Sequence, residues 1–587
     1  MKKLTALVLT AVMILSLAAC SSGTSDNTQN GAAQGNSEAQ QVTEATTAHK
    51  AEVVAAEDVT TEPAFEEETF APFDGPKELV VGISADIGTW DPWGSFSGGR
   101  QNMAPVIYQA LTADIANQET YEIVHYNVLA ESTERIGNGE YRIKIREGIV
   151  DTAGNPFTAE DAIFSYQTCI DQGRLGQVAI IESMEQEDDL TFVMKLSSDN
   201  VGGFSDICAA INMVTKESYE ASPDGMQTTP VGTSPMVLES YTQGSEAVFV
   251  KADSYWNDAA NESKDVKAGY CGMWDYSNID KVTYRIINNI TSMELALENG
   301  EIDIARAISS EDVESFENSD TVKTFFYWDG SYSIAFNTSE NSVCQNKNLR
   351  EAIAYAIDSE SCLSAACDNR GGVATCWSFW TFFDYLDEWT DREYFNYNMD
   401  TAKDYLKKFE EETGMKASDL SLELLYQNED TAEATALTIQ NFIGILTGNP
   451  NCVTLTSYDR GTYTSTKKSP DTFDITIVNG QLTTRTTSCY NWNDVSNTKV
   501  QGYNIFHDYT GEIDKYIEPV MAEETHNDDT VRAFQQFIDD NCYLKCLFYE
   551  VSYGAAAGWI HNTGAAIGAK GFLNIGALTY DWANSGK

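Results

Sequence analysis

The sequence is poor in residues that bind metals. Its 587 residues include five histidines, and no two of them have the spacing that places a pair on one face of a helix. The cysteines closest in sequence, Cys362 with Cys367 and Cys542 with Cys546, lack CxxC spacing, and no histidine is near them. We therefore expect no metal site and no cofactor.

The motifs of common nucleophilic and nucleotide-dependent enzymes are also missing. The stretch GSFSGG at 94–99 does not have the spacing of a GxSxG elbow, and there is no Walker loop and no dinucleotide-binding glycine pattern. A glycosidase-like carboxylate pair remains open among 89 acidic residues, but nothing singles out two of them. We expect a protein that is not an enzyme, with no catalytic residue.

Basic residues are few. Lysine and arginine together number 37 against 89 acids, and the formal net charge is −52. A chain this acidic repels nucleic acid and anionic lipid surfaces, so neither is expected as a partner. The 12 cysteines suggest no dense disulfide framework, because several, such as Cys208, Cys452 and Cys546, stand inside apolar runs and are expected to be small buried side chains.

No apolar run is long enough to cross a bilayer. The longest, Leu4 to Ala19, falls short of the about 20 apolar residues that a spanning helix needs. Lys2 and Lys3 precede it and small residues close it, as in a signal peptide. Its end, LAAC, resembles the lipobox of bacterial lipoproteins. The resemblance implies a signal peptide at 1–19 and a lipid on Cys20; an ordinary signal peptide is the alternative.

The segment after the signal predicts a tether. From Ser21 to Lys77 the chain is dominated by Ser, Thr, Gln, Asn, Ala and Glu, and it has too few large apolar side chains to offset chain entropy. We expect residues 20–77 to be a disordered tether with an r.m.s. span of roughly 40 Å. The folded part is then extracytoplasmic, held at the outer face of the bacterial cell membrane by the lipid alone.

The remaining about 510 residues are enough for two or three domains. Strands are predicted at 79–84, 422–426, 452–458 and 473–478, where short apolar runs are rich in β-branched residues. Helices are predicted after Thr158, which has Asp161 three residues on, and after Thr291, which has Glu294. A long helix lies between the strands at 422–426 and 452–458, which implies parallel pairing. The fold class is α/β.

Several motifs in one order carry a family resemblance. They are GTWDP at 88–92, YRIKIREGIVDTAGNPFTAEDAIFSYQ at 141–167, PVGTSPMVLESYTQGSEAVFVKADSYW at 230–256, ALENGEIDIA, SIAFNTSEN and LREAIAYAID. Together they resemble the family 5 solute-binding proteins, the oligopeptide- and dipeptide-binding type that serves ABC importers. The resemblance runs from about Leu79 to the C-terminus.

The resemblance implies a two-lobed, periplasmic-binding-protein-like clamp of the large type II family 5 architecture. Lobe 1 would comprise 78–325 plus 546–587, and lobe 2 would comprise 326–545. The chain would cross between them in two β-rich stretches, near 324–338 and 543–554. The implied function is delivery of a ligand, foremost an oligopeptide, to an ABC permease and ATPase complex, by a protein expected to be a monomer.

The resemblance also implies ligand-binding residues. The loop after the DP of GTWDP would line the cleft with Phe96, Ser97 and Gly98. In the family an aspartate after the strand that matches 473–478 pairs with the peptide α-ammonium. Here that strand continues through Gln481, and the aspartate's position falls near Thr483, so the amine anchor is missing unless Asp494 replaces it.

An aromatic segment, CWSFWTFFDYLDEW at 376–389, offers a second set of candidates. Trp377 and Trp380 would form stacking walls for a ligand, and the alternative is that the segment belongs to the core. The ligand itself stays open between a peptide, an oligosaccharide, a nickel chelate and another solute. A surface sensor or adhesin without a transporter is a further alternative.

Overall fold

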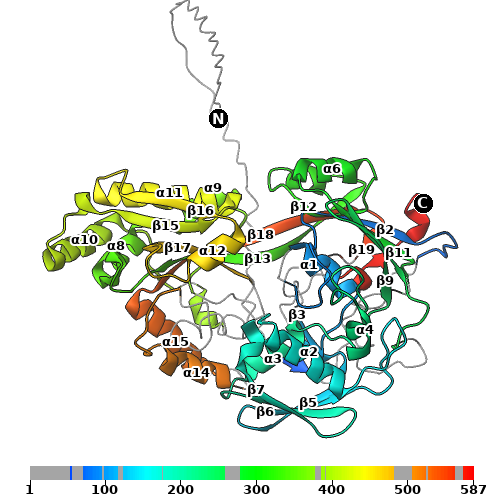
Figure 1. Ribbon diagram of the computed structural model, residues 1–587. Coiled ribbons are helices and arrows are strands. Elements are labelled where there is room, and N and C mark those ends of the chain that lie inside the picture. Colours follow the sequence, from blue (N-terminus) through cyan, green and yellow to red (C-terminus); the bar gives the residue numbers. More distant parts are fainter. Residues whose placement is uncertain are drawn as a thin grey trace, which may run out of the picture. The chain divides into compact units, whose positions relative to one another are not determined.

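The computed structural model describes residues 53–55, 70–94, 98–116, 123–174, 176–257, 276, 278–376, 385–390, 392–481, 505–523, 527–561, 563 and 573–587. Among these residues the chain forms α/β structure with one large mixed sheet (Figure 1). The strands of this sheet are β2 (Glu78–Ile83), β9 (Met236–Thr242), β10 (Glu246–Lys251), β11 (Lys281–Ile286), β12 (Ile304–Ile308), β13 (Val322–Phe336), β14 (Gly371–Val373), β15 (Leu422–Gln427), β16 (Val453–Tyr458), β17 (Ile475–Gln481) and β18 (Leu544–Ala557).

Three smaller sheets and a set of helices accompany the large sheet. The smaller sheets are β1 (Val53–Ala55), β4 (Ile123–Asn127) and β3 (Thr112–Ala116); β5 (Ala130–Gly137), β6 (Glu140–Ile145), β8 (Thr191–Leu196) and β7 (Ile181–Gln186); and β19 (Ile560–His561) with β20 (Thr579–Tyr580). The α-helices are α1 (Gly98–Met103), α2 (Ala159–Asp171), α3 (Val201–Ala210), α4 (Lys216–Ala221), α6 (Ile290–Glu298), α7 (Val313–Glu317), α8 (Lys347–Ala356), α9 (Ser359–Cys367), α10 (Met399–Thr413), α11 (Asp430–Thr447), α12 (Arg460–Thr466), α14 (Asp514–Ala522) and α15 (Asp528–Asn541).

The two long strands β13 and β18 are the centre of the large sheet. They pair antiparallel over most of their length and run side by side in Figure 1. On one side of the pair the order is β17, β15 and β16, and on the other it is β12, β2, β11, β10 and β9. The strands that the sequence predicts at 422–426, 452–458 and 473–478 are confirmed, and β15 pairs parallel with both β16 and β17, as the long connecting helix α11 implies.

The hydrophobic core divides along β13 and β18. One large cluster consists mainly of buried side chains from Leu79 to Tyr284. It also contains Phe325 and Tyr327 of β13 and further side chains between Ala556 and Trp582. Two further clusters lie within 332–548 and 335–549. Trp328, next to Tyr327, already packs on the third cluster. The packing therefore changes from one core to another at the middle of the long strands.

Local capping shows where the helix predictions hold. Thr158 precedes α2, and its backbone N–H donates to the Asp161 carboxylate at 2.8 Å, as predicted. The prediction of a capping box at Thr291 and Glu294 is wrong. Asn289 is the N-cap of α6 and accepts from the Ser292 N–H at 2.8 Å, while the Glu294 carboxylate accepts from the Ser309 N–H at 2.7 Å. A side chain that reaches a distant backbone donor is no longer available to the helix start.

The predicted tether is not without structure throughout. Val53–Ala55 pairs parallel with β4, and the Phe73 ring stacks on Trp582 with 6.4 Å between centroids. The Lys77 N–H donates to the Asp280 carboxylate at 3.0 Å. The prediction of a structureless segment at 20–77 is therefore wrong at these places. Cys20 and the signal segment lie outside the described residues.

Cysteine burial agrees with the sequence. The nine cysteines in the described ranges are buried and not joined in disulfides, among them Cys208, Cys452 and Cys546. Burial raises the pKa of the Cys546 thiol to about 11, so it stays protonated at neutral pH. These side chains act as small core residues and not as nucleophiles.

Candidate functional site

The loop that would line the ligand cleft follows a firmly held stretch after β2. Trp90 and Trp93 are almost fully buried, the Tyr108 hydroxyl donates to the Trp90 carbonyl at 2.8 Å, and the Trp93 N–H donates to the Asp91 carboxylate at 2.9 Å. Asp91 also forms an ion pair with Arg174 at 3.2 Å. GTWDP therefore fixes the point from which the candidate loop departs.

Two of the three candidates in this loop, Phe96 and Ser97, lie outside the described residues, and the third, Gly98, is the first residue of α1. The next residue shows why glycines stand here. A Cβ on Gly99 would lie 2.2 Å from the carbonyl carbon of Asp86, so any larger residue would push α1 away from the backbone after β2. The glycine-rich turn thus brings the start of α1 against the end of β2.

The segment with the amine-anchor candidates leaves the sheet at the long strand pair. Gln481 is the last residue of β17 and pairs with Gly330 of β13, which pairs in turn with Glu550 of β18. Two residues earlier in β17, the amide of Asn479 donates to the hydroxyl of its register partner Tyr332 at 3.1 Å. Thr483 and Asp494, which follow, lie outside the described residues.

The strand that leads into the aromatic segment, β14, enters the sheet at the same row and leaves it two residues on, where Val373 pairs with Phe548. Gly371 of β14 pairs with Glu550, the residue that pairs with Gly330. Gly371 has φ of 138°, and a Cβ there would lie 2.2 Å from the Tyr549 carbonyl oxygen, so only glycine fits. The sheet register therefore brings together the starting points of two segments, after Val373 and after Gln481, that are far apart in sequence.

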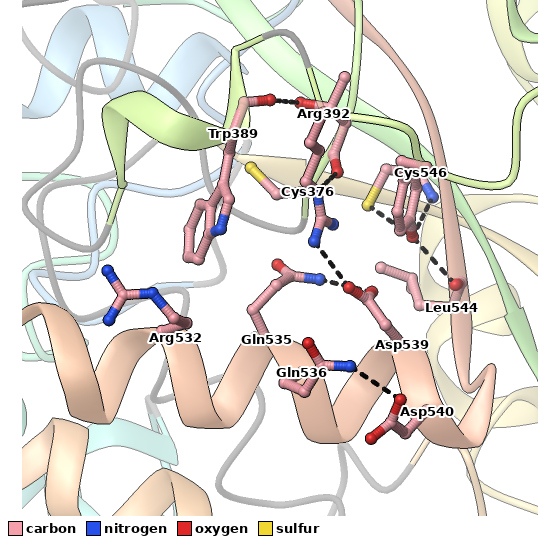
Figure 2. A network of polar contacts seen from close by, with 12 residues as sticks. Cys376, Trp389, Arg392, Arg532, Gln535, Gln536, Asp539, Asp540, Leu544 and Cys546 are labelled. Carbon is pink, nitrogen blue, oxygen red and sulfur yellow. Dashed lines mark hydrogen bonds and ion pairs between the residues drawn. The ribbon is translucent and has the colours of Figure 1, made fainter.

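The two ends of the aromatic segment are tied to each other. The Thr375 hydroxyl donates to the Trp389 carbonyl at 2.5 Å, and Arg392 Nε donates to the Thr375 carbonyl at 2.6 Å. Arg392 also binds Asp539 of α15 at 2.7 Å, and Asp539 accepts from the Gln535 amide at 2.7 Å (Figure 2). The described ends of the segment are thus held together and anchored on α15.

This anchor is a partly buried ion pair. Burial opposes the charge of Arg392, but the Asp539 carboxylate holds the pKa of the guanidinium above its ordinary value. Burial raises the pKa of Asp539 against the effect of Arg392. The guanidinium also lies 4.6 Å from the centroid of the Tyr394 ring. The ion pair and the ring contact together stabilise the charged forms of Arg392 and Asp539 in their partly buried positions.

The described aromatic residues of this segment belong to the core. Cys376, Tyr385, Leu386 and Trp389 are at most 5% exposed and join the third hydrophobic cluster. For these four the core alternative is confirmed. Trp377 and Trp380, the two proposed as stacking walls, lie outside the described residues.

Sequence reasoning overlooked Arg306 of β12. The residue is 7% exposed, and its guanidinium carbon lies 4.0 Å from the centroid of the Tyr327 ring in β13. Its Nε and Nη1 are buried and have no hydrogen-bond partner. The available signal was a single cation inside the otherwise apolar strand of DIARAI.

The described residues contain neither a cluster suited to a metal ion nor a helix suited to a membrane. No group of three or more His, Cys, Asp or Glu side chains in the described ranges is arranged to hold a metal ion. In the same part of the chain, none of the helices combines the length and the apolar character needed to cross a membrane.

The comparisons with known proteins agree on one family. The model of the bacterial extracellular solute-binding proteins, family 5, matches residues 125–484. Oligopeptide-binding protein AppA of Bacillus subtilis is 22% identical over 310 residues, which cover 51% of this chain and 53% of AppA. Heme-binding protein A of Haemophilus influenzae is 22% identical over 286 residues, covering 43% of this chain and 49% of that protein. The chain thus aligns with about half the length of these curated relatives.

A solved structure shows the fold over a longer range. The oligopeptide-binding protein AppA from Bacillus subtilis, in complex with a nonapeptide, superposes with a TM-score of 0.68 at 18% identity, covering 86% of this chain and 99% of that chain. The fold is therefore the α/β two-lobed clamp expected from the sequence motifs. The chain belongs to the bacterial extracellular solute-binding proteins of family 5.

Proposed function

We propose that the protein is an extracytoplasmic solute-binding subunit that delivers an oligopeptide to an ABC permease and ATPase complex. The observation that carries the proposal is the sheet row Gln481–Gly330–Glu550–Gly371. The two segments that the sequence marks for ligand contact leave the sheet at this row, after Gln481, and two residues from it, after Val373. The row lies where the core changes along β13 and β18. A ligand held there would contact both cores.

The proposal includes a division into two lobes, for which the change of packing along β13 is the support. Lobe 1 is 78–325 with 546–587, and lobe 2 is 326–545; the change of core after Tyr327 supports the first boundary. The two lobes would close around the ligand, and the importer would read the closed form. Shifting such an equilibrium from 1:99 to 99:1 requires about 5.5 kcal/mol of differential affinity.

Binding without catalysis is part of the proposal. Burial raises the pKa of thiols such as Cys546, and the sequence shows no recognisable motif that pairs a nucleophile with a base. Incubation of the purified protein with peptides or oligosaccharides should leave them intact. Turnover that is lost on substitution of a single carboxylate would reverse this assignment.

The anchor in the membrane is the lipid on Cys20, after removal of 1–19. Two acyl chains give durable attachment, because one chain alone binds marginally. The variant Cys20→Ala should appear in the medium and not in the membrane fraction, as judged by immunoblotting of both fractions. Retention of this variant in the membrane would contradict a lipid anchor.

The peptide amine is received without a charge from Thr483. A hydroxyl does not supply the charge-assisted bond that a carboxylate gives an ammonium group, so Asp494 or main-chain carbonyls take that role. If the ligand is neutral, Trp377 and Trp380, with the loop of Phe96, Ser97 and Gly98, supply most of the contact.

Calorimetry with trialanine and N-acetyl-trialanine tests this assignment. A large loss of affinity on acetylation that disappears in Asp494→Asn supports the displaced anchor. Equal affinity for both peptides supports a pocket that does not recognise the amine. Amine-dependent binding that is lost in Thr483→Ala and kept in Asp494→Asn would overturn the assignment.

A second candidate is the same fold with another solute, such as an oligosaccharide or a nickel chelate. Threonine at the position of the family's aspartate favours it, since the amine anchor is the feature specific to peptides. Mass spectrometry of small molecules that co-purify with the protein separates the two candidates. Peptides released on denaturation support the first, whereas sugars or metal chelates support the second.

A further inference from the structure

Arg306 is a buried cation that no residue in the described ranges neutralises. It is 7% exposed, and its Nε and Nη1 are buried and without a hydrogen-bond partner. Over the described residues no carboxylate or carbonyl oxygen bonds to it, and its contact is with the Tyr327 ring at 4.0 Å. Stacking on a ring face partly compensates the charge, but it leaves the N–H donors in the guanidinium plane without acceptors.

Such an arrangement calls for an acceptor from outside the chain. Buried donors are satisfied in almost all cases, and an unsatisfied charged group is the most costly exception. This chain does satisfy a comparable group elsewhere, because Arg350 is 5% exposed and donates to four main-chain carbonyls. Arg306 differs from Arg350 in that two of its guanidinium nitrogens, Nε and Nη1, are buried without an acceptor.

The register places Arg306 at the edge of the sheet region where ligands bind. β12 pairs parallel with β2, and Ala305 is opposite Gly82, so Arg306 lies level with Ile83 at the carboxyl end of β2. Ligands of α/β sheets bind outside the carboxyl ends of parallel strands. The guanidinium reaches across β18 to Tyr327 of β13, the last residue of the first core before the change of packing.

We propose that Arg306 is the anchor for a carboxylate of the bound ligand. A guanidinium presents its donors as a planar fork that matches the two oxygens of a carboxylate, so the donors left open in the chain would be satisfied together. The proposal deepens the proposed function, on which it rests for the peptide class of ligand. It adds that the ligand is an acid, recognised through its carboxylate.

The first test asks whether Arg306 serves the fold. We compare Arg306→Met with Arg370→Met, since Arg370 also stacks on a tyrosine, Tyr553 at 5.3 Å, and is partly exposed. After exhaustive dialysis, Arg306→Met should unfold at the same temperature as the wild type or a higher one, because an uncompensated buried charge is removed. A clear drop in unfolding temperature, with no drop in Arg370→Met, would make Arg306 a structural residue and overturn the proposal.

The second test uses a mixed library of tri- to nonapeptides and the same library amidated at the C-terminus. Bound peptides are counted by mass spectrometry after gel filtration. Wild type and Arg370→Met should retain the free acids roughly tenfold to a hundredfold better than the amides. Arg306→Met should retain both equally. Equal retention of acids and amides by the wild type would overturn the proposal.

A third measurement separates this proposal from the peptide function. Millimolar malonate should raise the unfolding temperature of the wild type and leave that of Arg306→Met unchanged. If neither library binds but malonate acts through Arg306, the peptide function fails and the anchor stands. If malonate acts equally on both proteins or on neither, the anchor fails. A rise with phosphate but not with malonate would overturn the assignment to a carboxylate.

Discussion

Two of the buried arginines in the described part of the chain, Arg350 and Arg306, are treated in opposite ways. In the region between α8 and the start of β18, Arg350 donates to the carbonyls of Cys344, Gln345, Asn541 and Cys542 over 2.6 to 3.2 Å. In the region between β12 and β13, Arg306 contacts an aromatic ring and has no acceptor in the part of the chain that the structure describes. The first arginine completes the fold. The second is complete only when another molecule supplies the acceptor.

The first region repeats this solution with other groups. Lys545 of β18 is 1% exposed and its ammonium donates to the carbonyls of Ala354, Ile357 and Phe395, each at 2.8 Å. His507 is 2% exposed, and its Nε2–H donates to the Lys467 carbonyl at 3.1 Å. Carbonyl oxygens at helix ends and turns are natural acceptors for buried cations. Comparing these groups with Arg306 separates structural burial from a binding role.

The largest effect on this comparison is expected from Arg350→Met. The substitution leaves four carbonyls buried without their donor, so the free energy of unfolding should fall by about 3–5 kcal/mol. Urea denaturation at pH 7 measures this change, with Arg306→Met as the matched control. Equal losses of unfolding free energy in the two variants would contradict the distinction between Arg350 and Arg306.

Lys545 gives the next effect, and it depends on pH. Burial lowers the pKa of Lys545 to about 8 in the folded protein, below the about 10.4 of an exposed lysine. The unfolded chain therefore binds the extra proton between these two values, and the free energy of unfolding of the wild type rises with pH in that window.

The measurement compares the wild type with Lys545→Met, which does not titrate at this position. The difference in unfolding free energy, wild type minus variant, should increase by about 1 kcal/mol for each pH unit between pH 8 and 10. Urea unfolding at three pH values gives the difference. A difference that stays constant or decreases would show that the ammonium remains charged in the fold.

Much of the fold follows from the sequence because it depends on local patterns. The apolar runs at 324–338 and 543–554 became the paired strands β13 and β18, and Thr158 with Asp161 marked the start of α2. Predictions from local sequence were wrong where a contact with a distant residue determined the position of a side chain. Glu294 was expected to cap α6, but it bonds to the Ser309 N–H, which no local pattern reveals.

The site was less predictable for a related reason. Whether a buried charge is satisfied depends on acceptors that are distant in sequence. Arg350 finds two of its carbonyls at 541 and 542, almost two hundred residues away, and Arg306 finds none in the described chain. Nothing near either arginine distinguishes them. The candidates at Phe96, Trp377, Trp380, Thr483 and Asp494 stay predictions.

The smallest effect is expected at His507. Burial lowers the pKa of its imidazole to about 4, compared with about 6.5 in an unfolded chain. The Lys467 carbonyl accepts from Nε2–H, and the Tyr509 hydroxyl lies 3.2 Å from Nδ1, where it can donate to the neutral ring. Below pH 6.5 the unfolded chain takes up a proton that the folded protein refuses, so stability is lost as the pH falls towards 4.

The variant His507→Asn tests this step, because asparagine does not titrate and tolerates the left-handed backbone at φ of 50°. Between pH 6.5 and 5 the wild type should lose roughly 1–2 kcal/mol of unfolding free energy relative to the variant. Parallel urea titrations at both pH values measure the loss. If wild type and variant change in parallel, His507 is protonated in the fold, and it does not belong with the groups that the chain satisfies by itself.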